Sequence, residues 1–313
     1  MTRSALAAAL ALTMTAAPTA QAQTFPFPPE APMMESNACL SSWALLMAFL
    51  GATPPEGEPL AAPVTEEGHC RVDNVLVRSP RHIFHAERIS WAASGLEALM
   101  QGALPDRIDL VAEGFGMLSH VDQPVWDYVM LAQSRASAGM ALRLSVTHRE
   151  GVVTVSQADI DFPDDSRASL TATLTGIDPA TPAGALLQTA RLDIHTAGLF
   201  ERYLLAPIVT AYFDPALPME PQADMQRAQA TALVTALPEA SFPPETRAAM
   251  AAFIADFPNP RGDLGITLDA PDGMRLTQLG HLGGLEGAEA LASAFEGVQI
   301  GISYDPISEG APD

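Results

Sequence analysis

Apolar and polar side chains alternate along much of the chain after residue 70, a period that predicts β-strands. In the clearest run, Ala168, Leu170, Ala172 and Leu174 alternate with serine and threonine. The same pattern recurs in five further segments, at Ile108–Ala112, Leu142–Thr147, Leu192–Ile194, Leu264–Leu268 and Val298–Ile302. Alternation with one polar face is typical of an antiparallel sheet that is covered on one side. Gly151 predicts a tight hairpin between two of the strands.

Helical periodicity marks the N-terminal part of the chain and several segments between the strands. Asn37–Ala52 places Leu40, Trp43, Leu46, Met47 and Leu50 on one face, with Ser36 or Asn37 as its expected cap. Five later segments carry apolar residues at helical spacing: Gly95–Gly102, Pro124–Ala138, Leu199–Phe213, Glu220–Leu237 and Pro244–Phe257.

These elements predict an α+β fold: a long, twisted, mainly antiparallel sheet with amphipathic helices packed on one face. We divide the chain into a signal peptide (1–22), an N-terminal helix with a disulfide-tied loop (23–70), a sheet-rich region (71–213) and a helical pair followed by C-terminal strands (214–313). The last boundary, between residues 213 and 214, is placed at the start of the proline-rich, aperiodic segment Asp214–Pro221.

The first residues have the three parts of a cleavable secretory signal. Arg3 supplies the positive charge, Ala5–Ala17 is apolar, and Ala20-Gln21-Ala22 follows Pro18 as a cleavage site. We therefore expect a mature chain that begins near Gln23 in the periplasm or outside the cell. The next apolar run, Trp43–Ala52, is about half the length of a membrane span, so we expect no transmembrane span in the mature chain.

Charge excludes one class of partner. The chain has 37 acidic and 16 basic residues, every basic residue is arginine, and the formal net charge is −21. Such a surface repels phosphate backbones, so we expect no nucleic-acid partner.

The two cysteines, Cys39 and Cys70, are predicted to form a disulfide, because an even number of cysteines in an oxidising compartment indicates a structural bridge. Their spacing is not that of a Cys-x-x-Cys redox pair, and a zinc site would need further ligands nearby.

Motifs for catalysis or cofactors are missing from the sequence. Ser94 lacks the Gly-x-Ser-x-Gly context of a hydrolase, no His-Glu-x-x-His occurs, and Gly114-Phe115-Gly116 lacks the third glycine of a dinucleotide site. His82 and His85 are expected to lie on a strand and therefore to face opposite ways. We predict no catalytic residue, no cofactor and no metal ligand.

One acidic cluster leaves two interpretations open. Asp159, Asp161, Asp164 and Asp165 provide oxygen ligands that calcium prefers, but their spacing is not that of an EF-hand loop. Beside Pro163, aspartate is also a common turn residue.

A basic cluster supplies the one candidate ligand site. Arg78, Arg81 and Arg88 lie close together in a chain with few positive charges. The guanidinium group suits carboxylate or phosphate, so these residues could bind an anionic head group. Alternatively, they balance neighbouring carboxylates.

The strand–helix–strand units Ile89–Glu113 and Leu276–Tyr304, the export signal and the segment Phe257–Leu264 are similar to uncharacterised secreted alphaproteobacterial proteins. Those proteins resemble the broad AsmA/YdgA-like envelope families, which are built from long twisted sheets. The resemblance implies an envelope setting. It departs from the families in the N-terminal membrane anchor, which this chain is expected to lose.

Together these observations favour an exported, non-enzymatic envelope protein that holds an apolar or amphipathic, lipid-like ligand between sheet and helices. The alternative is an envelope assembly or protein-interaction factor without a ligand. An unrecognised hydrolase is the third reading. An apolar channel would favour the first class, and an exposed apolar patch would favour the second.

Overall fold

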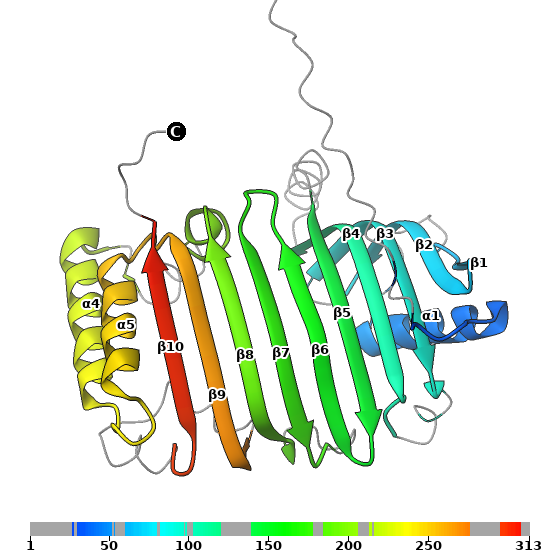
Figure 1. Cartoon of the computed structure of the whole chain (residues 1–313). Helices are drawn as coiled ribbons and strands as arrows, with labels where there is room; N and C mark the ends of the chain where they lie inside the picture. The colour runs from blue at the N-terminus through cyan, green and yellow to red at the C-terminus, as the bar shows by residue number, and fades with distance from the viewer. Residues whose placement is uncertain are drawn as a thin grey trace, which may run out of the picture.

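The strands form one open sheet in which each strand is hydrogen-bonded to its neighbour in the sequence and runs antiparallel to it (Figure 1). The computed structural model describes most of the 313-residue chain. The described residues are 27, 30–51, 53, 60–79, 82–96, 98, 103–119, 139–177, 184–205, 213–214, 216–275 and 295–307.

The strands lengthen after a short first edge strand. Their bounds are β1 Val64–Glu66, β2 His69–Arg78, β3 His82–Ser94, β4 Arg107–Ser119, β5 Met140–Arg149, β6 Val152–Asp161, β7 Arg167–Thr175, β8 Leu186–Thr196, β9 Gly262–Arg275 and β10 Gln299–Pro306. The predicted α+β class and the antiparallel sheet are therefore confirmed.

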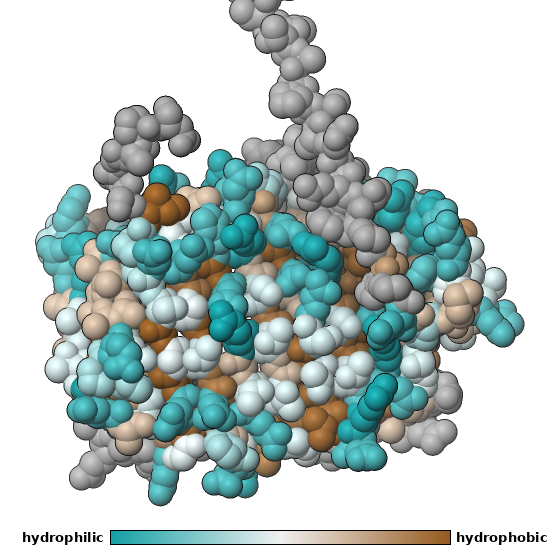
Figure 2. Space-filling model, viewed as in Figure 1, coloured by the Kyte–Doolittle hydropathy of each residue, from teal (hydrophilic) through white to brown (hydrophobic). Residues whose placement is uncertain are grey.

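The strand register gives the sheet one polar and one apolar face. Arg167 on β7 lies opposite His195 on β8, which lies opposite Asp263 on β9. The next residue pairs are apolar, with Ala168 opposite Ile194. Because successive side chains point to opposite faces, the predicted alternation produces these two faces. Figure 2 shows the polar one, where side chains of intermediate hydropathy and hydrophilic side chains lie over the strands and apolar surface is visible between them.

The predicted hairpin at Gly151 joins β5 and β6. Glu150 and Gly151 have positive φ angles of 52° and 77°, the conformation that a two-residue hairpin of type I′ requires. Glycine adopts this conformation without steric cost, which explains why the turn falls at this position.

The N-terminal helix α1 (Ser36–Leu50) packs against the apolar face at the β1 end of the sheet. Trp43 and Met47 are buried there, as predicted, but Leu40 is 53% exposed and lies on the outer side of the helix. The predicted cap is also wrong. Glu35 occupies the cap position without a side-chain hydrogen bond, Ser36 is already the first helical residue, and its hydroxyl accepts a hydrogen bond from Thr65.

Three further helical elements are described: a π-helical turn, η3 (Phe200–Leu204), and the helices α4 (Met219–Ala236) and α5 (Pro244–Ala255). α5 lies beside the outer edge of β10, and α4 packs on α5 (Figure 1). The Thr246 hydroxyl donates to the carbonyl of Ile300 and accepts from the amide of Ile302, at 3.2 Å each. The free edge of the last strand is therefore occupied by a helix.

Strands from both sides of the predicted boundary at residues 214–221 belong to the same sheet, since β8 pairs directly with β9. Within the described residues, no helix has the length and apolarity that a membrane crossing requires. The signal peptide 1–22, the helix Pro124–Ala138 and much of Leu199–Phe213 lie outside the described residues.

Candidate functional site

Cys39 and Cys70 form the predicted disulfide, which joins α1 to β2. Both cysteines are buried in a cluster that includes Trp43 and Trp91, whose rings stack with centroids 5.7 Å apart. The Trp91 indole donates to the Ser42 hydroxyl at 2.9 Å. The surroundings of this disulfide are those of a structural bridge.

The arginine cluster is divided by the sheet. Arg88 contacts Asp73 at 3.0 Å and Glu113 at 3.5 Å, and Arg71 also binds Asp73. Burial by itself would raise the pKa of Asp73, but the hydrogen bonds from Arg88 and Arg71 outweigh it and lower the pKa. Arg88 therefore balances carboxylates on its own face of the sheet.

Arg78 lies further along the sheet, where it pairs with Ile83 at the end of β2. Ile83 and Arg88 stand five positions apart on β3, which separates the two arginine backbones by roughly 16 Å. Arg81 lies outside the described residues. An anionic head-group site at these arginines stays a prediction.

Half-buried apolar side chains occupy the middle of the apolar face. They come from β5 to β9, and none belongs to the cluster around the disulfide or to the cluster beneath α5. This set, here called the apolar stripe, consists of Leu142, Leu144, Val146, Ile160, Leu170, Leu192, Ile194 and Ile266. It lies between two closed cores, and its side chains keep part of their surface uncovered.

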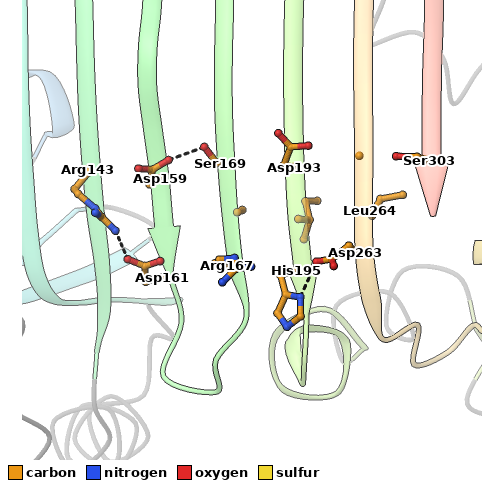
Figure 3. Close-up of a pocket in the computed structure, with 13 residues that line it drawn as sticks. Arg143, Asp159, Asp161, Arg167, Ser169, Asp193, His195, Asp263, Leu264 and Ser303 are labelled. Atoms are coloured by element: carbon orange, nitrogen blue, oxygen red, sulfur yellow. Dashed lines mark hydrogen bonds and ion pairs between the residues drawn. The ribbon is translucent and has the colours of Figure 1, made fainter. Parts of the chain in front are cut away.

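A charged groove of about 520 Å³ lies on the opposite, polar face, across β5 to β10 (Figure 3). The strand register brings its side chains together in two rows. One row contains Asp161, Arg167, His195 and Asp263. The second row contains Arg143, Asp159, Ser169, Asp193, Gly265 and Ser303.

Most charges in the groove already have partners within the protein. Arg143 binds Asp161, and Asp159 accepts hydrogen bonds from the Ser169 hydroxyl at 2.7 Å and from Gln157 at 2.6 Å. Arg191 at the rim binds Asp193 through two nitrogens, at 2.6 and 2.8 Å. These carboxylates are fixed in position, as a preformed binding surface requires.

His195 and Asp263 form the one contact in the groove that resembles part of a catalytic triad. The Nδ1 atom of His195 lies 2.7 Å from a carboxylate oxygen of Asp263. Ser169 directs its hydroxyl to Asp159, and Ser303 is on β10, two strands away from His195. Neither serine is placed for activation by this histidine, since a general base must reach the hydroxyl within about 3.2 Å.

The acidic cluster that could have bound calcium is divided between two environments. Asp159 and Asp161 lie on the same face of β6, as predicted, and are held by the groove contacts. Asp164 lies in the following turn, where it accepts from the Ser166 amide at 3.1 Å, and Asp165 has a positive φ of 66°. Within the described residues, no three His, Cys, Asp or Glu side chains are grouped to hold a metal ion.

A second hollow of about 410 Å³ adjoins the groove on β8 to β10 and reaches the start of α5. A smaller apolar pocket of about 210 Å³ lies between α4 and α5 and includes Phe213, Phe253 and Phe257. In the described part of the chain, the two larger hollows are lined by polar and apolar groups in similar measure, whereas the smaller pocket is almost entirely apolar.

The chain matches no known family model and no curated protein. Sequence reasoning singled out Asp159 and Asp161 as possible calcium ligands but missed the other groove residues, such as Arg143, Arg167 and Ser303. The available signal was charged residues at the polar positions of neighbouring strands, such as Arg167 and Asp193. Without the register, nothing indicates that these positions meet.

Proposed function

We propose that this is an exported, non-enzymatic envelope protein that holds an apolar or amphipathic, lipid-like ligand against the apolar face of its sheet. The apolar stripe carries this proposal. It is a continuous surface, because one row of the strand register runs from Leu142 through Ile160 to Ile194 across β5 to β8. The face that carries α1 is the face that receives the ligand.

The energetics favour an apolar occupant. Burying one leucine or isoleucine side chain completely contributes about 1.5–3 kcal/mol. The stripe residues are half-buried, so a ligand that covered them would gain the part of this free energy that folding has not already used. A ligand with an extended hydrocarbon chain would cover several of them at once. The loss of water from this surface would then drive binding without any catalytic group.

The alternative is an assembly or interaction factor without a ligand, and a separate observation favours it. Three large apolar side chains are exposed near the disulfide end: Met33 at 80%, Leu40 at 53% and Val64 at 52%. An exposed apolar patch is typical of protein docking sites. The net charge of −21 argues against nucleic acid in either case.

Native mass spectrometry on protein purified from its own envelope tests the proposal. We predict a co-purifying lipid-like mass in the wild type and at least a tenfold loss of it in Leu170→Gln, which adds a polar group to the stripe. Thr171→Gln is the matched control, because Thr171 follows Leu170 on β7 and points to the polar face. Thr171 is exposed, so the Thr171→Gln variant should retain the ligand.

Equal ligand content in folded Leu170→Gln, or no ligand in the wild type, would contradict the proposal and favour the interaction factor. The same measurement on Arg78→Gln/Arg88→Gln tests the predicted head-group site. Retention of ligand by that folded double variant would remove these arginines from the site.

A further inference from the structure

The charged groove and the hollow beside it form one trough on the polar face. Asp193, Gly265 and Ser303 line both hollows, so the two are continuous. The trough runs from β5 to β7 and the His195–Asp263 contact at one end, along β8 to β10, to the start of α5 at the other. It lies on the face opposite the apolar stripe and is independent of the proposed lipid-like ligand.

Two glycines in the middle of strands form its floor. A Cβ atom on Gly265 would lie 2.7 Å from the Ser303 hydroxyl, and one on Gly301 would lie 2.5 Å from the Thr267 hydroxyl. Neither glycine is needed for a left-handed turn, since neither has a positive φ. Glycine weakens a strand, and inside one it often marks a place where a ligand or another backbone approaches closely.

The trough has unpaired charges of opposite sign at its two ends. Among the described residues, the guanidinium group of Arg167 at one end has no hydrogen-bond or ion-pair partner. At the other end, Asp269 and Glu245 likewise have no such partner within the described chain. The charges between them, such as Arg191 and Asp193, are paired with each other. A ligand that spans the trough would therefore need an anionic group at one end and a cationic group at the other.

The strand register sets the distance between these ends. Arg167 shares a row with Asp263, and Asp269 is six positions along β9 from Asp263, which corresponds to about 20 Å. An extended peptide spans about 3.3–3.6 Å per residue, so roughly six residues would cover the distance. Asp193, Thr267 and Ser303 line the trough with oxygen atoms; Asp193 is held by Arg191, and the Thr267 hydroxyl donates to the carbonyl of Gly301 at 3.4 Å.

We propose that the trough binds a short, unblocked peptide in an extended conformation. Its terminal carboxylate contacts Arg167 beside His195, and its terminal ammonium group contacts Asp269 and Glu245. The arginine fork suits a carboxylate, and such charge-assisted hydrogen bonds are stronger than neutral ones. The hydroxyl groups of Ser303 and Thr267 lie over Gly265 and Gly301, so the floor under the peptide backbone is low and polar.

Isothermal titration calorimetry with the full-length mature protein tests this proposal. The probes are a degenerate pool of hexapeptides with free termini, the same pool with C-terminal amides, and the same pool with N-terminal acetyl groups. We expect the free pool to bind, and each blocked pool to bind at least tenfold more weakly. No binding of the free pool at millimolar concentration, or equal binding of the amidated pool, would overturn the proposal.

Three variants localise the binding. Arg167→Gln should weaken the free pool at least tenfold and leave the amidated pool unchanged. Gly265→Val should abolish binding while the protein stays folded, because the Ser303 hydroxyl can rotate away and valine is favoured in strands. Arg149→Gln is the control, since this exposed arginine on β5 is not among the residues that line the trough. Unchanged binding by folded Gly265→Val would show that the peptide binds elsewhere and would contradict the proposal that the trough is its site.

Discussion

The two ends of the sheet bury their apolar surface by different means. At the β1 end, a single helix is held to β2 by the Cys39–Cys70 disulfide, and the first strand has only three residues. At the β10 end, the pair α4–α5 packs on the sheet edge through aromatic contacts and hydrogen bonds. No disulfide is present there among the described residues.

The difference follows from how much each helical part contacts the sheet. α5 packs along most of β10, and Phe242 and Phe295 join in the core beneath it with ring centroids 4.9 Å apart. The N-terminal segment has a short edge strand and one helix, so fewer contacts oppose its release. A covalent link that shortens the free loop in the unfolded chain compensates for this.

The largest expected effect comes from removing one large core side chain at either end. Trp43→Ala and Phe242→Ala should each lower the free energy of unfolding by about 3–5 kcal/mol, because both side chains are almost fully buried. Denaturant unfolding followed by circular dichroism measures this. A loss below about 1 kcal/mol at one end would show that this end is not part of the cooperative core.

Breaking the disulfide should have the next largest effect. The bond closes a loop of 31 positions, so the double variant Cys39→Ser/Cys70→Ser should lose about 3–4 kcal/mol of stability. Exchange of backbone amides should increase in α1 and β2 and stay unchanged in α5 and β10. Uniform destabilisation with no local difference would contradict the comparison between the two ends.

The smallest effect concerns the charges at the β1 end. The pKa of Asp73 is lowered in the folded protein, so its contribution to stability is present above its unfolded pKa of about 3.9 and is lost as the pH falls through the lower folded value. Asp73→Asn should therefore flatten the decrease in stability on acidification below about pH 4. Thermal unfolding from pH 2 to 7 measures it, with the exposed Asp269→Asn as the matched control. An unchanged acid profile in Asp73→Asn would show that its ion pairs contribute nothing.

Local patterns were sufficient to predict much of the fold. The alternation from Ala168 to Thr175 predicted β7, and Glu150-Gly151 predicted the hairpin between β5 and β6. The periodicity in Pro244–Phe257 predicted α5. Each of these signals lies within a few residues of the element that it specifies, because backbone period and turn geometry depend on neighbours in the chain.

The candidate sites were not predictable in the same way. Arg78 and Arg88 are close in sequence, yet the antiparallel pairing of β2 and β3 separates them. Arg143 and Ser303 are far apart in sequence, yet they line one groove. Sequence distance was misleading in both cases because contacts across a sheet depend on strand order.

By itself the sequence determined the alternating period in β4, β5, β7, β8, β9 and β10, the helical period of α1, α4 and α5, and the cysteine pair. The tertiary structure alone decided that Leu40 lies on the outer side of α1 and that Arg167, His195 and Asp263 share a row. The physical reason is that register is a relation between strands. A shift by one residue would move every side chain of a strand to the opposite face, and the burial of apolar side chains beneath α1 and α5 opposes such a shift.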